Sequence, residues 1–257
     1  VYKRQLHTSS NNAVTGLEKQ LGLLLYQPYK LMIFLPILIF STNLIGALVV
    51  VLMALGLNRF ARMLPVLWAR INALSSLSRV KVSGRQHVDP HQSYVIVANH
   101  RSHFDILAVY GWLGIDFRWV MKQELRKVPA LGIACEKLGH VFVDRSDSDK
   151  ARASIEQVKA EIREGTSIFF FPEGTRTEGV QMLPFKRGAF KLAKELGLPV
   201  LPITINGSGK VLPARSLNLV PGNVELIIHA PIPSADADEQ ELSCLARDRI
   251  ASHLESP

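Results

Sequence analysis

The segment from Asn99 to Asp105 reads N-H-R-S-H-F-D and contains a histidine and an aspartate that are suited to proton transfer. His100 and Asp105 are five positions apart. On one continuous helix their side chains would point about 140° apart and would not easily meet. We therefore expect His100 in the turn after a strand and Asp105 in the first turn of the next helix. From there the carboxylate reaches one imidazole nitrogen, and the other nitrogen can take a proton from a substrate hydroxyl group.

Two other interpretations of this segment stay open at this point. A histidine near an aspartate is most often an ordinary surface or turn residue, and the chain contains eight histidines. A metal site made of His100, His103 and Asp105 is less favoured, because H-x-x-H-x-D matches none of the common zinc signatures and no cysteine lies nearby. We therefore expect no bound metal.

A second polar turn follows the apolar run that ends at Phe171, and residues 171–176 read F-P-E-G-T-R. Its proline fixes φ, and Gly174 permits a tight or left-handed turn. The turn would present Glu173, Thr175 and Arg176 at a strand end. Arg176 suits a phosphate group, because a guanidinium binds two of its oxygens at once. For Glu173 three roles are open: it orients Arg176, it binds substrate, or it supports the histidine turn.

Two further cations also follow predicted strands, Arg145 and Lys186. Together with Arg176 they would form one phosphate pocket if the strand ends meet. Taken singly, each is better explained as an ordinary surface cation.

The elements that must position these turns are predicted from the apolar pattern after Val80. Strands are expected at 80–82, 94–98, 117–121, 141–143, 167–171, 200–205 and 224–228, and helices at 103–113, 129–138, 148–164, 188–196 and 239–254. This alternation predicts an α/β fold with a mixed, largely parallel sheet flanked by helices. Polar residues directly after such strands lie at the carboxyl edge of the sheet, where α/β folds bind ligands.

The N-terminal part has a different character, because residues 31–57 contain no charged side chain. As one helix they would be about 40 Å long, more than the ~30 Å hydrocarbon core of a bilayer. They form either a single tilted spanning helix or a re-entrant or in-plane hairpin bent near Asn43. Residues 58–78 then predict an amphipathic helix with basic residues, which lies in the headgroup layer or packs on the catalytic domain.

The composition limits the partners. The net charge is +8, which predicts an anionic partner: nucleic acid, a phosphate-bearing substrate or an anionic lipid surface. No nucleic-acid-binding signature is present, so we expect no nucleic acid. The two cysteines, Cys135 and Cys244, lie far apart and favour a reducing compartment. The chain begins with Val1, and we expect no cleavable signal peptide in residues 1–12.

Four ordered blocks resemble the glycerolipid acyltransferase family, most closely its 1-acylglycerol-3-phosphate O-acyltransferases. The blocks are N-H-R-S-H-F-D at 99–105, G-H-V-F-V-D-R at 139–145, F-P-E-G-T-R at 171–176 and L-P-I-T-I-N-G at 201–207. The match covers about residues 80–230. One departure is Thr177, where many members have serine.

The resemblance implies transfer of a fatty acyl group from acyl-CoA or acyl carrier protein to the sn-2 hydroxyl of 1-acylglycerol 3-phosphate, giving phosphatidic acid. It implies His100 as general base and Asp105 as the residue that orients it, with no covalent acyl-enzyme and no cofactor beyond the thioester co-substrate. The expected substrate-binding residues are Arg145, Glu173, Gly174, Thr175, Arg176 and Lys186. The alternatives are an acyltransferase on glycerol-3-phosphate or another lysolipid and, from a different class, a membrane-bound lipid hydrolase. For a hydrolase, the G-x-S-x-G elbow is missing.

We expect three regions: an N-terminal tail at 1–30, membrane-associated helices at 31–79 and a catalytic domain at 80–257. The expected partners are the lysophospholipid, the acyl thioester, the membrane bilayer and, as one donor, acyl carrier protein. The expected location is the inner (cytoplasmic) membrane, with the catalytic domain facing the cytoplasm.

Overall fold

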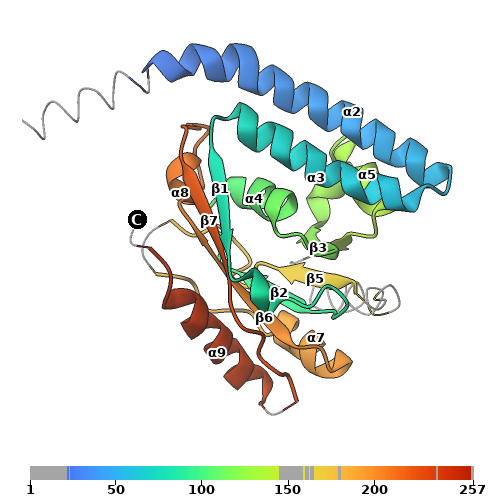
Figure 1. Ribbon diagram of the computed structural model, residues 1–257, viewed down its shortest axis with the longest axis vertical. Coiled ribbons are helices and arrows are strands. Elements are labelled where there is room, and N and C mark those ends of the chain that lie inside the picture. Colours follow the sequence, from blue (N-terminus) through green and yellow to red (C-terminus); the bar gives the residue numbers. More distant parts are fainter. Residues whose placement is uncertain are drawn as a thin grey trace, which may run out of the picture.

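A mixed sheet organises the chain in the computed structural model, which describes residues 24–144, 165–178, 181–235 and 237–255 and the single residues 22, 159 and 162 (Figure 1). The strands are β1 (Arg79–Ser83), β2 (Val95–Ala98), β3 (Phe117–Lys122), β4 (Val141–Val143), β5 (Ser167–Phe170), β6 (Val200–Asn206) and β7 (Asn223–Ile228). Their order is β1-β7-β6-β2-β5-β3-β4, and only the β6–β7 pairing is antiparallel. The predicted α/β fold with a mixed, largely parallel sheet is therefore confirmed.

Helices cover both faces of this sheet. They are α4 (Phe104–Trp112), α5 (Leu131–Lys137), α7 (Gly188–Leu196), α8 (Ser208–Val211) and α9 (Glu239–Ala251), with short 3-10 helices η2 (Arg85–His87) and η3 (Gln123–Lys127). The N-terminal helices and α4 lie on one face, and α7 and α9 lie on the other (Figure 1). The predicted helix at 148–164 falls almost wholly outside the described residues.

Strand β2 is buried on both faces because it lies in the middle of the sheet. Ile96 and Ala98 belong to the core beneath α4, whereas Val95 and Val97 belong to the core beneath α7 and α9. Alternate side chains of a strand point to opposite faces, so a strand covered on both faces is apolar throughout. This explains the continuous apolar run before Asn99, and it fixes the end of β2 firmly between two packed layers.

The N-terminal apolar segment is one continuous helix from Leu24 to Ala54, long and apolar enough to cross a membrane by length and composition. It contains a π-helical turn, η1 (Lys30–Phe34), and the regular helix α2 (Leu35–Ala54). The chain reverses at residues 55–57 and returns as α3 (Asn58–Ser75), which lies between α2 and α4 (Figure 1). The helical reversal is therefore present, but it occurs after α2.

The bend that the sequence suggested near Asn43 is not formed, and hydrogen bonds explain why. The hydroxyl of Thr42 donates to the carbonyl of Leu38 at 2.6 Å, and the amide of Asn43 donates to the carbonyl of Ile39 at 2.8 Å. Polar side chains that bond to the preceding helical turn are compatible with a continuous helix. The hydroxyl of Ser41 lies 3.3 Å from the carbonyl of Leu38 and also accepts the side-chain N–H of Asn72 on α3 at 2.9 Å, so this polar stretch joins two helices.

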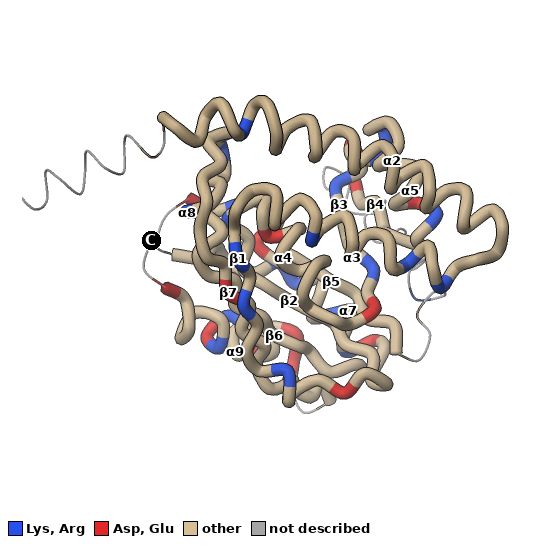
Figure 2. Tube along the Cα trace, turned by 45° about the horizontal axis from the view of Figure 1, so that its top comes forward, with Lys and Arg blue, Asp and Glu red and all other residues tan. Residues whose placement is uncertain are grey.

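Most of the large side chains on the apolar face predicted for α3 point outward, although Leu64 and Trp68 are half-buried. The small residues Ala61, Ala69 and Ala73 are fully buried. Small side chains let a helix approach its neighbours closely, so α3 packs through its small face. The exposed large residues of α3 are Phe60, Met63, Leu67, Ile71 and Leu74. Figure 2 shows the neighbouring α2 without charged residues along its length after Lys30.

Candidate active site

The histidine turn starts where β2 ends, and a buried amide anchors it. The side chain of Asn99 donates to the carbonyl of Ile205 at 2.9 Å and accepts the N–H of Ile205 at 2.8 Å. These two bonds tie the end of β2 to β6, its neighbour in the sheet. His100 follows directly and lies in the turn, and α4 begins at Phe104. The predicted placement of His100 and Asp105 is therefore correct.

The two members of the dyad are in direct contact. The Nδ1 atom of His100 and Oδ2 of Asp105 are 2.7 Å apart. Asp105 is fully buried, and the same oxygen also accepts the N–H groups of Arg101 and Ser102, each at 2.9 Å. A carboxylate oxygen that only accepts hydrogen bonds fixes the proton of the imidazole on Nδ1. The lone pair of Nε2 is then directed away from Asp105, as a base that takes a proton from a substrate requires.

The turn at 171–176 lies against the histidine turn. The ring of Phe171 stacks on the imidazole of His100, with centroids 3.8 Å apart and planes 11° apart. The N–H of His100 donates to Oε1 of Glu173 at 2.9 Å, and the N–H of Thr177 donates to the carbonyl of His100 at 2.9 Å. Asp105 therefore holds the edge of the His100 imidazole and Phe171 holds its face. The backbone N–H and carbonyl of His100 are both bonded to the turn at 171–177.

The carboxylate of Glu173 is occupied by groups of the protein. Its side chain is buried, and Oε2 accepts the hydroxyl of Thr177 at 2.5 Å and the N–H of Leu183 at 3.0 Å. Of the three roles that the sequence left open for Glu173, these contacts fit support of the histidine turn. Thr177, the departure from the usual serine, keeps the hydroxyl that this bond needs.

The cations expected near the site have different surroundings. In the part of the chain that the structure describes, Nη1 of Arg176 is buried and has no hydrogen-bond partner. Desolvation, together with the charges of Arg176 and His100, lowers the pKa of His103, which agrees with a position of Arg176 close to the histidine turn. An unpaired buried guanidinium nitrogen favours an anionic ligand.

Lys186 lies over the same turn. A Cβ at Gly174 would come within 2.8 Å of Cε of Lys186, and the φ angle of Gly174 is +75°, so this position requires glycine. Thr175 is exposed on the turn. Arg145 lies outside the described residues. Among the described residues, no group of three or more histidine, cysteine, aspartate or glutamate side chains is arranged to hold a metal.

The second block contains a histidine of a different kind. His140 is buried, the N–H of Trp119 donates to its Nδ1 at 3.2 Å, and its Nε2 contacts the hydroxyl of Tyr110. Burial lowers the pKa of His140 to about 3. This imidazole is therefore neutral and joins α4 to β3.

Three of these supporting residues lie in the matched sequence blocks, but the sequence alone assigned them no role. Asn99 and Phe171 stand inside the matched blocks, and their position beside His100 and Glu173 was the available signal. Ser102 is the third: its hydroxyl donates to the carbonyl of Leu212 at 2.6 Å and accepts the N–H of Phe104 at 3.0 Å. This buried serine therefore holds the start of α4 against the segment after α8.

Comparisons with known proteins agree with this geometry. A sequence profile described as Acyltransferase matches residues 79–206. The chloroplastic 1-acyl-sn-glycerol-3-phosphate acyltransferase of Brassica napus is 33% identical over 200 residues, which are 77% of this chain and 57% of that protein. The human 1-acyl-sn-glycerol-3-phosphate acyltransferase alpha is 32% identical over 173 residues, which are 67% of this chain and 61% of that protein. The chain thus spans less than two thirds of the length of these curated relatives.

A solved structure extends the similarity to nearly the whole chain. The crystal structure of the 1-acyl-sn-glycerophosphate acyltransferase PlsC from Thermotoga maritima matches with a TM-score of 0.77 and 26% sequence identity, over 91% of this chain and 95% of that one. The matched sequence profile includes both the His100 turn and the Glu173 turn. Sequence and fold therefore agree that the chain belongs to the acyltransferase family that includes the 1-acyl-sn-glycerol-3-phosphate acyltransferases.

Proposed function

We propose that the protein transfers a fatty acyl group from an acyl thioester, acyl-CoA or acyl carrier protein, to the sn-2 hydroxyl of 1-acylglycerol 3-phosphate. The product is phosphatidic acid. The observation that carries this proposal is the contact of 2.7 Å between His100 and Asp105 at the carboxyl edge of the sheet. The activity printed in the names of the relatives supports the same reaction.

The proton transfer follows from the orientation of the imidazole. Neutral His100 accepts the proton of the glycerol hydroxyl on Nε2, while Asp105 holds Nδ1–H and stabilises the imidazolium that forms. The hydroxyl oxygen attacks the thioester carbonyl, the carbon–sulfur bond breaks, and the thiolate takes the proton back from His100. No covalent acyl-enzyme is needed, since the substrate hydroxyl is itself the nucleophile.

The cations provide the positioning. Arg176 binds the phosphate of the acceptor, with Lys186 beside it and Arg145 as a third contributor. A phosphate held at a fixed distance from His100 keeps the hydroxyl within reach of the base, which lowers the entropic part of the barrier. Glu173 and Thr177 support this arrangement because they connect the two turns.

We further propose that α2 and α3 attach the protein to the cytoplasmic face of the membrane, with α2 lying along the surface. Two contacts hold α2 flat on the rest of the protein. In the helical segment that precedes α2, the hydroxyl of Tyr29 donates to the carbonyl of Ser75 at 2.9 Å, and within α2 a Cβ at Gly46 would be 3.2 Å from Cβ of Ala130. Exposed leucine, isoleucine and phenylalanine side chains on α2 then face the lipid. In this proposal residues 31–79 are the membrane-associated part and 80–257 the catalytic domain.

Turnover by the purified protein tests the reaction. Release of free thiol is measured with palmitoyl-CoA and with palmitoyl-acyl carrier protein, each against 1-acylglycerol 3-phosphate, glycerol-3-phosphate and a lysolipid without a phosphomonoester. We expect 1-acylglycerol 3-phosphate to give the highest kcat/KM. A higher kcat/KM for glycerol-3-phosphate, or for the lysolipid without a phosphomonoester, would show that 1-acylglycerol 3-phosphate is not the preferred acceptor.

The hydrolase alternative is tested separately. Ser102, the serine next to the dyad, is buried and its hydroxyl is already engaged. We therefore expect no labelling by a fluorophosphonate probe. Labelling together with release of free fatty acid in the absence of an acceptor would overturn acyl transfer as the main reaction.

A further inference from the structure

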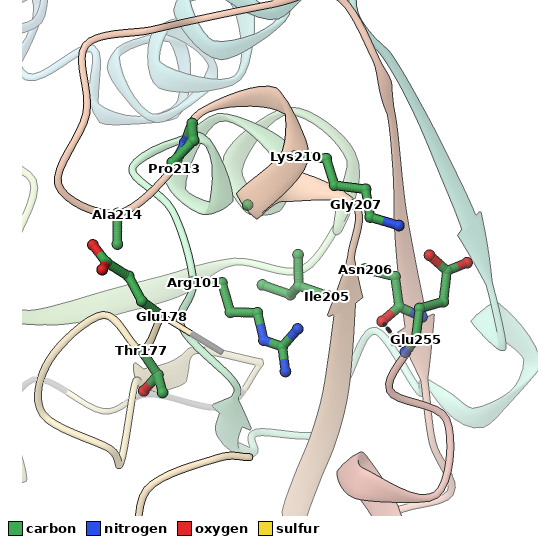
Figure 3. A pocket seen from close by; sticks show the side chains of 11 residues that line it. Arg101, Thr177, Glu178, Ile205, Asn206, Gly207, Lys210, Pro213, Ala214 and Glu255 are labelled. Carbon is green, nitrogen blue, oxygen red and sulfur yellow. Dashed lines mark hydrogen bonds between the residues drawn. The ribbon is translucent and has the colours of Figure 1, made fainter. Parts of the chain in front are cut away.

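A pocket of about 220 Å³ lies directly beside the histidine turn (Figure 3). Its lining includes Arg101, the residue after His100, and Thr177, whose N–H bonds to the carbonyl of His100. The opposite wall is formed by Asn206, at the end of β6, and by Gly207, Gly209 and Lys210. The pocket therefore shares two of its walls with the turns that hold the dyad.

Arg176 and Lys186, the cations proposed to bind the acceptor phosphate, are not among the residues that line this pocket, although Thr177 and Glu178, which follow Arg176, form part of its rim. In the sheet β2 lies between β6 and β5. The Arg176 turn follows β5, whereas the wall around Asn206 and Gly207 follows β6. An acyl transfer needs two substrates that meet at one base. If the acceptor phosphate lies on the β5 side, the β6 side is the open approach for the acyl donor.

The side chains of the pocket suit a polar, anionic arm. Figure 3 shows the side chain of Arg101 reaching into the middle of the pocket, between Thr177 and Ile205. The two carboxylates of the lining lie at its margins (Figure 3): Glu178 is paired with Arg215 at 3.7 Å, and Glu255 follows α9, where its N–H donates to Oδ1 of Asn206 at 3.0 Å. A guanidinium at the centre with carboxylates at the rim favours a phosphate placed next to Arg101.

Two glycines, Gly207 and Gly209, form part of the wall of the pocket. A Cβ at Gly207 would come within 2.1 Å of the carbonyl oxygen of Asn223, and φ at Gly207 is +77°, so no other residue fits this turn without strain. A Cβ at Gly209 would lie 3.6 Å from Cβ of Arg101. The volume is below the 300–1,000 Å³ that is usual for whole small-molecule ligands. A single linear chain fits it better than a complete nucleotide.

We propose that this pocket, the donor pocket, holds the phosphopantetheine arm of the acyl thioester, with Arg101 contacting the phosphate of the arm. The inference rests on the proposed acyl transfer and adds the side from which the donor approaches. The arm is common to CoA and to acyl carrier protein, so the pocket serves either source. Arg101 thereby contributes its backbone to the dyad, through its bond to Asp105, and its side chain to the donor.

Binding of free CoA in the absence of an acceptor tests the pocket independently of turnover. Isothermal titration compares the wild-type protein with Arg101→Gln and Arg101→Lys. We expect the Kd for CoA to rise about tenfold in Arg101→Gln, as for the loss of one charge-assisted hydrogen bond, and less in Arg101→Lys. Arg249→Ala is the control, because Arg249 is an exposed arginine on α9. An unchanged Kd in Arg101→Gln, or an equal change in the control, would overturn the proposal.

Steady-state kinetics identify which part of the donor Arg101 contacts. In Arg101→Gln we expect the KM to rise about tenfold for both palmitoyl-CoA and palmitoyl-acyl carrier protein. It should stay within about twofold for the palmitoyl thioester of N-acetylcysteamine, which lacks the phosphate, and for 1-acylglycerol 3-phosphate. A rise confined to CoA would assign Arg101 to the nucleotide part, and a rise for the acceptor would assign the pocket to the lysolipid. Either result would overturn the proposal.

The two proposals fail in different ways. A wild-type protein that binds CoA through Arg101 but transfers no acyl group to any lysophospholipid would end the proposed function and leave the donor pocket standing. A protein that makes phosphatidic acid with a KM for palmitoyl-CoA that Arg101→Gln does not change would end the donor-pocket proposal and leave the proposed function standing.

Discussion

The N-terminal helix pair and the carboxyl edge of the sheet both bury polar side chains, but they present opposite surfaces. On α2 the buried residues include Ser41 and Gly46, whereas Phe40 and Leu44 are 69% and 45% exposed. In the sheet the buried residues of β2 are all apolar, and polar side chains begin only at its end. Soluble proteins rarely expose apolar surface over such a length. Helices that meet in lipid instead contact each other through small and polar residues.

The buried polar groups of the two regions also differ in what they hold. Between the helices, the amide of Asn72 donates to the hydroxyl of Ser41 at 2.9 Å, and the indole of Trp68 donates to Thr42 at 3.0 Å. These neutral bonds only join α2 to α3. At the sheet edge the buried groups include the carboxylates of Asp105 and Glu173, which hold the imidazole and the backbone N–H of His100. Removing a polar group should therefore affect activity at the sheet edge and attachment or stability in the helices.

The largest expected effect is that of His100→Ala. Loss of the base should lower kcat by about 10²–10⁴-fold with 1-acylglycerol 3-phosphate. The melting temperature should change little, because Asp105 keeps its bonds to the N–H groups of Arg101 and Ser102. Thiol release and thermal unfolding are measured on the same preparation, with the exposed His91→Ala as the control. Near wild-type turnover in His100→Ala would contradict the mechanism.

The next largest effect is expected for Glu173→Gln, which retains the shape of the side chain. A glutamine cannot accept hydrogen bonds from the N–H groups of both His100 and Leu183 through two equivalent oxygens, so one donor loses its partner. We expect kcat to fall about 10–100-fold and the free energy of unfolding to fall by about 1–3 kcal/mol. Urea unfolding and a separate determination of kcat and KM check this.

A role of Glu173 in substrate binding would give a different result. The KM for the acceptor would then rise, while the free energy of unfolding would not change. Thr177→Ser and Thr177→Val separate the two cases further. Serine keeps the hydroxyl that donates to Glu173 and should retain activity, whereas valine removes it and should resemble Glu173→Gln.

The sequence allowed these two regions to be predicted to different depths. The positions of the strands and the contact of His100 with Asp105 can be predicted locally, because the spacing of apolar residues and the residue types of a turn act within a few residues. The antiparallel β6–β7 pairing and the bond between Glu173 and the N–H of His100 cannot. Each depends on partners far apart in the chain. Asn72, for example, is 31 residues away from the serine that it binds.

The outward face of α2 gives the third prediction. The double variant Phe40→Glu with Leu44→Glu places two carboxylates on the surface proposed to face lipid. We expect at least a tenfold loss of cosedimentation with anionic phospholipid vesicles, because it costs free energy to place a charged side chain among lipid hydrocarbon chains. Activity in detergent should be retained. Leu245→Glu on α9, an apolar residue that is 43% exposed, is the matched control and should bind vesicles as the wild type does. Equal vesicle binding by the double variant would mean that this apolar surface has another partner.

The smallest expected effect lies between the two helices. Asn72→Ala removes the donor to the hydroxyl of Ser41 and to the carbonyl of Trp68, and should lower the free energy of unfolding in detergent by about 1 kcal/mol. Adding Ser41→Ala should cost little more, since the partner left unpaired by the first substitution is then also removed. A double-mutant cycle of unfolding free energies measures this coupling. If Asn72→Ala lowered kcat as strongly as Glu173→Gln while stability was unchanged, the two regions would not be separate in function. The contact of α3 with α4, the helix that carries Asp105, would then be part of the catalytic machinery.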